Sequence, residues 1–400
     1  MGRSRWVQRW LGGVAVALLT AFAGTPPPPD ATASPAAVPS PESAAGAAGP
    51  AGAAVTGSVP GAADPAGAAS GGPPPGAADP AALARLAADP TWLRLLHARD
   101  GRHGEVVSEG FYLAAGGAAD PAAELAATLA ALATPLGDDP DAHPRCRFPA
   151  RAFWLHRQGA LPGWRPEPRC QQFERWALLP QLRGVSLLLV SGYFGNPAST
   201  FGHALLKLDT GAGGSELLDL AFNFGALVPE NEPTPVYVWR GLTGGYQAGF
   251  SDKFFYTQDA VYTRTEFRDM WAYDLGLTED QRLLLVFHLW EVVGRKFTYW
   301  FLTQNCAFRM AELLELVTGH PFVDGVRGWY SPVELFHRLR ALDAGPLPGL
   351  VARVRYLPSA QRTAFHAFEA LAPEEVEAAN GAIADGLASL PGRLAPLPPP

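Results

Sequence analysis

The chain has 400 residues, of which 48% are hydrophobic and 17% are charged, and its formal net charge is −7 at pH 7. An acidic chain without a block of Lys or Arg is not expected to bind nucleic acid. Its length allows one large domain with additions.

The first 23 residues have the pattern of a secretory signal peptide. Three arginines precede an apolar run at 11–23, and Ala21-Phe22-Ala23 fits a small-x-small cleavage site. An uncleaved anchor is the alternative, which we disfavour because the run is shorter than the ~20 residues of a spanning helix. Cleavage would remove three arginines and no acid, so the net charge would change from −7 to −10. We expect a periplasmic or secreted protein that is soluble or peripherally bound to a membrane.

Residues 24–80 are almost wholly Ala, Pro and Gly, and the heptapeptide Pro-Gly-Ala-Ala-Asp-Pro-Ala occurs at 60–66 and again at 75–81. Such a composition cannot bury a core, so the segment is predicted to be a disordered linker. Leucines at helical spacing resume between 81 and 132, and a loop-rich, Pro-containing stretch follows. We therefore assign 81–180 to a helical and loop-rich N-terminal region.

The chain contains three cysteines, Cys146, Cys170 and Cys306. In an oxidising compartment, Cys146 and Cys170 are suitably spaced, within the loop-rich stretch, to form a disulfide. That pairing leaves Cys306 as an odd thiol, for which catalysis is one explanation. The alternative is a buried free cysteine that packs as a small hydrophobe.

Residues 181–330 carry the clearest secondary-structure signals. A capping box at Thr278-Glu279-Asp280-Gln281 starts a helix that runs to about Val293. Asn305 is a good N-cap for a second helix, and Gly319 and Pro321 end it. Strands are predicted at 185–191, 203–209, 217–224, 236–239, 270–275 and 297–301. The sum is an α+β fold, an antiparallel sheet packed against two helices, followed by a C-terminal helical extension at 331–400.

Cys306 lies in the first turn of the second helix. The helix dipole and the unpaired N–H groups at that end favour the thiolate. Cys306 is therefore the candidate nucleophile.

His203 is the candidate base for Cys306. It stands at the start of a predicted strand, after Gly202, where glycine lets the backbone turn closely. Packed next to the thiol, its imidazole could take the thiol proton and return it to a leaving group. Asn223, on the following strand, could orient the imidazole. The alternatives are an ordinary buried strand histidine for His203 and a turn-forming residue before Gly225 for Asn223.

Several spaced motifs of this chain resemble the Lnb N-terminal periplasmic domain family. The Asn305-Cys306 helix start with an upstream histidine also resembles a circularly permuted, NlpC-type papain-like fold. The segments that carry the resemblance are Cys146 to Arg151, Ser199-x-Phe201-Gly202-His203, Asn223-Phe224-Gly225-Ala226, Gly241-Leu242-x-Gly244-Gly245-Tyr246, Tyr262-x-x-x-Glu266-x-Arg268-Asp269, Tyr273-x-Leu275 and Asn305-Cys306.

The resemblance implies acyl transfer in bacterial lipoprotein modification. Cys306 would accept a fatty acyl group from a phospholipid or another acyl donor and pass it to a lipoprotein or peptide amine, with peripheral membrane contact. No cofactor and no metal are expected. Four residues are candidates for substrate binding or oxyanion support: Ser199, Gly202, Tyr299 and Asn305.

Other signals are weaker. Gly241 to Gly249 is Gly-rich but lacks the lysine and the strand-to-helix context of a phosphate loop, so it is interpreted as a turn or a lid. His288 and Glu291 have the i, i+3 spacing of metal ligands but no further spaced partners. Tyr299, Trp300 and Phe301 fit either the core or an acyl pocket. No G-x-S-x-G sequence occurs, which disfavours a serine hydrolase.

Three hypotheses for function follow. The first is a secreted thiol acyltransferase that uses Cys306 and His203. The second is a Cys-His peptidase or amidase that acts on cell-wall peptides, because the same pair can deliver an acyl group to water. The third is a non-catalytic binding domain that keeps the fold. Dependence on lipid separates the first two hypotheses, and an unreactive Cys306 would favour the third.

Overall fold

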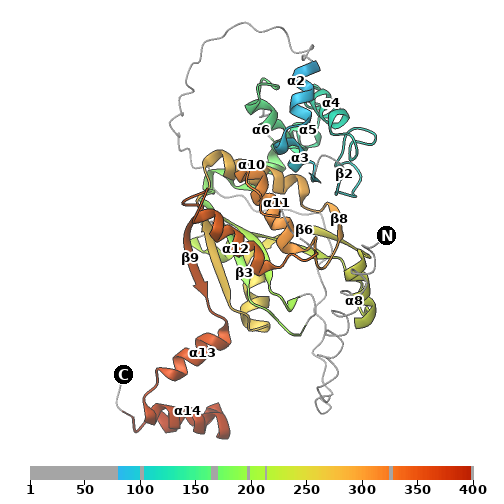
Figure 1. Ribbon diagram of the computed structural model, residues 1–400. Coiled ribbons are helices and arrows are strands. Elements are labelled where there is room, and N and C mark those ends of the chain that lie inside the picture. The colour runs from blue at the N-terminus through green and yellow to red at the C-terminus, as the bar shows by residue number, and fades with distance from the viewer. Residues whose placement is uncertain are drawn as a thin grey trace, which may run out of the picture. The chain divides into compact units, whose positions relative to one another are not determined.

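The computed structural model describes residues 80–99, 103–163, 170–195, 199–211, 214–323 and 328–397 (Figure 1). The predicted signal peptide at 1–23 and the linker, up to residue 79, lie outside these ranges. None of the helices within the described ranges is long and apolar enough to span a bilayer.

A seven-stranded antiparallel sheet forms the centre of the fold. Its strand order is β8-β6-β5-β4-β3-β7-β9. The strands are β3 (Gly184–Val190), β4 (His203–Asp209), β5 (Leu220–Ala226), β6 (Tyr246–Phe254), β7 (Met270–Leu275), β8 (Lys296–Tyr299) and β9 (Val351–Leu357). β3 and β4 pair along their whole length, from Gly184 opposite Asp209 to Val190 opposite His203.

Helices cover one face of the sheet. α11 (Cys306–Thr318) packs on β4 and β5, with α10 (Glu279–Val292) beside it and α12 (Pro332–Asp343) on its other side (Figure 1). The capping box of α10 forms as predicted, and Asn305 caps α11 by accepting the N–H of Phe308. The remaining helices of this part are α8 (Thr234–Thr243), α9 (Phe255–Asp259), α13 (Ala360–Glu369), α14 (Pro373–Asp385) and α15 (Leu390–Leu394).

The opposite face of the sheet has its own smaller apolar cluster. Phe255 of α9 and Tyr262, from a π-helical turn at 260–265, pack there against Val190 and Leu205. Register partners in an antiparallel pair share a face, so His203, opposite Val190, belongs to this side. The side chain of His203 therefore leaves the sheet on the face of this smaller cluster, at the end of β4.

The N-terminal region is helical and loop-rich. Its elements are α2 (Pro80–Ala87), α3 (Pro90–Leu95), β1 (Ala98–Arg99), β2 (His103–Gly104), α4 (Pro121–Leu132), α5 (Pro144–Arg147), α6 (Pro149–Arg157) and α7 (Gln171–Ala177). β1 and β2 form a short antiparallel pair. α6 and α7 pack on α10.

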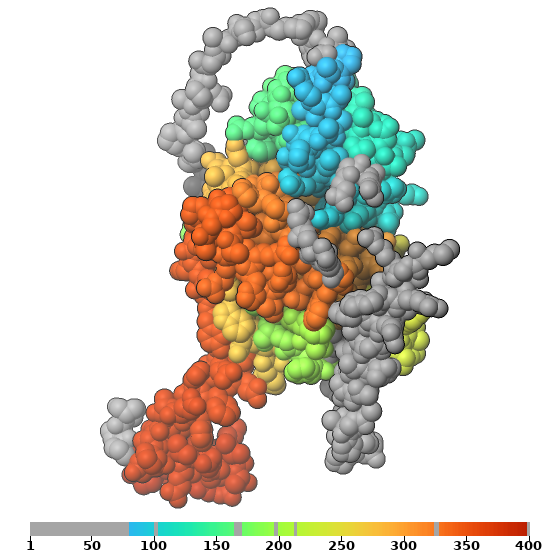
Figure 2. All heavy atoms as spheres, viewed as in Figure 1, coloured from blue at the N-terminus to red at the C-terminus, as the bar shows by residue number. Residues whose placement is uncertain are grey.

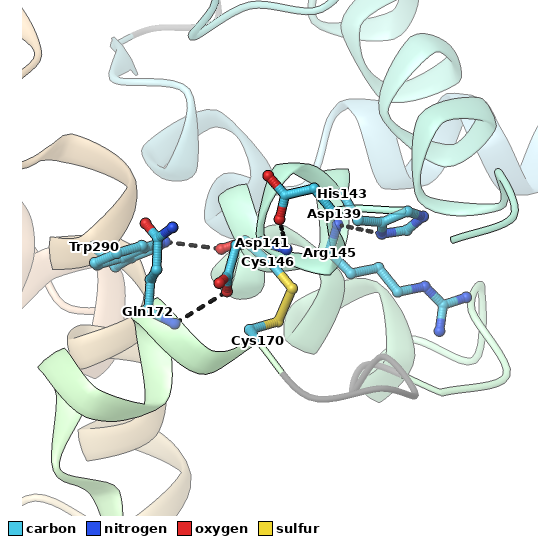
Figure 3. The surroundings of a disulfide bond; sticks show 8 residues. All are labelled: Asp139, Asp141, His143, Arg145, Cys146, Cys170, Gln172 and Trp290. Carbon is cyan, nitrogen blue, oxygen red and sulfur yellow. Dashed lines mark hydrogen bonds between the residues drawn. A yellow bond between two sulfur atoms is a disulfide. The ribbon is translucent and has the colours of Figure 1, made fainter. Parts of the chain in front are cut away.

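The predicted disulfide is confirmed. Cys146 of α5 is bonded to Cys170, which precedes α7 (Figure 3). Cys306 is free. The indole N–H of Trp290, from α10, donates to the carbonyl oxygen of Cys146 at 2.8 Å. The N–H of Gln172 donates to Asp141 at 3.0 Å. The disulfide thus links α5 to α7, and both of its ends lie against α10.

Two sequence-based predictions of secondary structure are wrong. Residues 236–239 form part of α8, because Pro235 sits at the first turn and Gly244 ends the helix in a left-handed conformation. The segment from Gly241 to Gly249 contains the end of α8, a turn at Gly244 and the start of β6, which agrees with the turn interpretation. The C-terminal segment also differs from a purely helical extension, since β9 pairs with β7.

Candidate active site

The site is built at the N-terminus of α11. Cys306 is the first residue of the helix and is 8% exposed. Asn305 fixes this turn with its whole amide: the oxygen accepts the N–H of Phe308 at 3.2 Å, and the nitrogen donates to the carbonyls of Phe301 and Tyr330 at 3.0 and 2.7 Å. Asn305 therefore orients the turn that carries the thiol, and both N–H groups of its amide are used for this.

β4 and β5 separate where the thiol approaches the sheet. Their ladder pairs Leu206 with Phe222 and Lys207 with Ala221, and it does not continue to His203. A side-chain contact replaces the missing ladder: His203 Nε2 lies 2.5 Å from Asn223 Oδ1. With Nε2 directed at Asn223, Nδ1 is the ring nitrogen that is left for Cys306. The structure thus brings the three predicted residues, Cys306, His203 and Asn223, together.

The electrostatics of the pair favour a thiolate and an imidazolium. Burial by itself raises the pKa of Cys306, but the charge and the hydrogen bond of His203, with the N–H groups of Ala204 and Ala307, outweigh it and lower this pKa below its usual value. Burial likewise acts to lower the pKa of His203, but the Cys306 charge and the bonds to Cys306 and Asn223 raise it on balance. Each group therefore stabilises the charged form of the other.

A small pocket that is partly open to solvent borders Cys306. Four of its nine lining residues are aromatic, and the full set is Phe201, Gly202, Tyr299, Phe301, Asn305, Cys306, Trp329, Ser331 and Pro332. The ring centroid of Phe201 lies 4.8 Å from that of Trp329, edge to face, and 6.4 Å from that of Phe301. An apolar chain could lie against these rings while its polar end reaches the thiol.

The other predicted site residues have different places. Gly202 has φ +89°, and a Cβ there would meet the Val190 carbonyl oxygen at 2.8 Å, so glycine is required to start β4 in this position. Ser199 is not part of the pocket lining, and its carbonyl closes the turn by accepting the N–H groups of Tyr193 and Gly202. Tyr299 lines the pocket, and burial, followed by the Cys306 charge, raises its pKa, so its hydroxyl stays protonated.

Sequence reasoning missed several residues around the site. Trp329 and Ser331 precede α12, and Pro332 is its first residue; the available signal was Ser331-Pro332-x-Glu334, a helix start in which Ser331 accepts the N–H of Glu334. Tyr262 places its ring 5.9 Å from the imidazole of His203. The quoted motif from Tyr262 to Asp269 was the available signal for this residue, although it did not reveal the contact. His288 and Glu291, the weak metal candidates, face His97 and Arg151, respectively.

The fold and this arrangement define a candidate thiol active site carried by an α+β domain. Comparison with known families agrees with the resemblance seen in the sequence: residues 172–339 match the Lnb N-terminal periplasmic domain, so the chain contains a domain of that family. Residues 84–158 match a domain of unknown function (DUF7843). Searches of curated proteins and of solved structures gave no match.

Proposed function

We propose that this protein is a periplasmic thiol acyltransferase that modifies lipoproteins. Cys306 would take a fatty acyl group from a lipid ester and pass it to an amine, the α-amino group of a lipoprotein. The observation that carries the proposal is the mutually stabilised pair of Cys306 and His203 beside a pocket whose lining includes four aromatic side chains. The family match supports both the periplasmic location and the connection to lipoproteins.

The chemistry has two steps. In the first, the Cys306 thiolate attacks the ester carbonyl, a C–S bond forms, the ester C–O bond breaks, and the His203 imidazolium gives its proton to the departing alkoxide. In the second, the amine attacks the thioester, His203 takes a proton from the amine, and the C–S bond breaks as the amide forms. The thiolate is regenerated, so no cofactor is needed.

Two groups near Cys306 suit the developing oxyanion. The backbone N–H of Cys306 belongs to the first turn of α11, where N–H groups and the helix dipole favour negative charge. The protonated hydroxyl of Tyr299 lines the same pocket. Asn223 keeps the imidazole oriented through the hydrogen bond at its Nε2. In this domain the histidine precedes the nucleophile along the chain, which is consistent with a permuted papain-like core. We propose that core as the fold type.

The aromatic walls favour lipid acyl groups over cell-wall peptides. Phe201, Phe301 and Trp329 offer ring faces and edges, whereas a peptide substrate would need hydrogen-bonding partners along its backbone. The same pair could hydrolyse a thioester, so the amine acceptor has to compete with water at Cys306.

The decisive experiment is the intact mass of the protein after incubation with lipid. Phosphatidylglycerol vesicles, a diacylated lipopeptide, both together and a cell-wall peptide form four arms, and the lipopeptide-only arm shows whether the acceptor can also be the acyl donor. We expect one acyl group on Cys306 that neutral hydroxylamine removes, and an N-acylated lipopeptide as the product. Cys306→Ala should give neither. Cleavage of the cell-wall peptide without any acyl adduct would establish the peptidase instead.

A further inference from the structure

One carboxylate from the N-terminal region holds both sides of the nucleophile's turn. Glu105 Oε1 accepts the side-chain N–H of Gln304 at 2.9 Å, and Glu105 Oε2 accepts Arg309 Nη1 at 2.5 Å. Gln304 comes just before Cys306, and Arg309 lies one helical turn after it. Glu105 belongs to the segment that matches the domain of unknown function, so both hydrogen bonds come from outside the matched Lnb domain.

Backbone pairing places Glu105 for this contact. Val106 forms an antiparallel bridge with Phe297, and the N–H of Val107 donates to the Lys296 carbonyl at 2.8 Å. Ser108 Oγ accepts the N–H of Lys296 at 2.7 Å. The segment therefore docks along β8, the strand that ends at the pocket residue Tyr299.

Arg309, the partner of Glu105 Oε2, is itself held by several contacts. Its side chain is fully buried, Nη1 also contacts Glu312 Oε2 at 2.6 Å, and the guanidinium lies 4.5 Å from the ring centroid of Phe297. Removing one partner of a buried ion pair leaves an uncompensated charge, so the three charged groups hold one another in place. Glu105 is the member of this set that comes from the N-terminal region.

A second chain of buried contacts joins the same region to α11 and α10. His97 Nδ1 lies 3.4 Å from Glu312 Oε2, and His97 Nε2 lies 3.1 Å from His288 Nε2. The carboxylate of Glu291 then accepts the N–H of Ala150, at the start of α6, at 2.7 Å. In the space-filling view, the described residues of the N-terminal region lie against those of α10 and α11 (Figure 2).

We propose that residues 84–158 serve to position the reactive thiol, with Glu105 as the positioning residue. Its carboxylate fixes the turn from Gln304 to Arg309, so that the sulfur of Cys306 stays within hydrogen-bonding reach of His203. The inference rests on the proposed role of Cys306 as the nucleophile. Accurate placement matters because a shift of about 1 Å between reacting groups can cost on the order of a hundredfold in rate.

The direction in which one substitution changes the alkylation rate of Cys306 separates positioning from a simple electrostatic effect. Glu105→Gln removes a negative charge near Cys306, and the field change alone would stabilise the thiolate and speed alkylation by iodoacetamide. Loss of positioning predicts the opposite, a decrease in the alkylation rate of at least about fivefold at pH 7. Glu109→Gln is the matched control, because Glu109 is an exposed acid of the same segment. Rates would be taken as full pH profiles, with the unfolding temperature of each variant measured alongside.

A double-mutant cycle tests the contact itself. Gln304→Ala removes the partner of Glu105 Oε1 without changing the N-terminal region. It therefore tests the same contact if Glu105→Gln fails to fold. The decreases in alkylation rate caused by Glu105→Gln and by Gln304→Ala should be strongly non-additive in the double variant. Alkylation of Glu105→Gln at the wild-type rate or faster would overturn the proposal. If Glu105→Gln slows alkylation while the wild type forms no acyl adduct with any lipid, positioning stands and the acyltransferase assignment fails.

Discussion

His203→Ala should slow the alkylation of Cys306 and move its pH dependence to higher pH. Alkylation requires the thiolate, so the rate rises with pH through the pKa of the thiol. In the wild type, His203 is the main group that lowers this pKa against the opposite effect of burial. Without the imidazole, burial dominates and raises the pKa, so the rise in rate comes at higher pH than in an ordinary thiol.

The size of the effect follows from the contact between the two side chains. Loss of an opposite charge at hydrogen-bond distance reduces the thiolate fraction by roughly ten- to a thousandfold at a pH below the thiol pKa. A thiolate of higher basicity is also the better nucleophile, which recovers about half of that loss on a logarithmic scale. The rate at pH 7 should therefore fall by about three- to thirtyfold. Asn223→Ala leaves the imidazole in place and removes only its partner at Nε2, so a smaller loss is expected.

Stopped-flow or mass-resolved alkylation between pH 5 and pH 10 would measure these profiles. His366→Ala is the matched control, because His366 is an exposed histidine of α13, outside the candidate site. A His203→Ala profile that superimposes on that of the wild type would show that the two groups do not interact, and the active site built on them would have to be abandoned.

Three further changes test the structure around the site. Cys170→Ser opens a disulfide between residues 24 positions apart, which should destabilise the fold by about 3 kcal/mol. In calorimetry the unfolding temperature should fall by about 6 °C, and an unchanged temperature would contradict the pairing. Gly202→Ala forces a left-handed residue with a Cβ against a carbonyl, so it should cost about 1–3 kcal/mol in denaturant unfolding and slow alkylation, whereas Gly137→Ala, in open space, should do neither. Trp329→Ala removes the edge contact with Phe201, so it should raise KM for long acyl donors more than for short ones; an equal loss at every chain length would exclude Trp329 from chain recognition.

Local patterns were sufficient where the backbone and its nearest neighbours decide the structure. The capping box at Thr278 starts α10 because it satisfies N–H groups within one turn, and Asn305 starts α11 in the same way. Alternation of apolar and polar residues did not reveal β9, because its residues are exposed or half-buried on both faces of the strand. It also misassigned 236–239, where β-branched and aromatic residues are part of α8.

The sequence also contained the chemical identities of the site. A thiol at a helix start and a histidine after a glycine at a strand start indicate a nucleophile and a base, because each needs a particular local backbone. Spacing along the chain could not show that β4 and β5 separate at His203, since that depends on how the whole sheet twists and pairs.

The amino-acid sequence alone therefore determined which groups could react and how the turns that carry them begin. Only the tertiary structure decided which of these groups meet. The contact between Glu105 and Arg309 joins residues 204 positions apart, and it exists because the N-terminal segment docks on β8 and places the half-buried Glu105 against the buried Arg309. Such a contact depends on burial and pairing across the folded chain, and no local pattern at either residue encodes them.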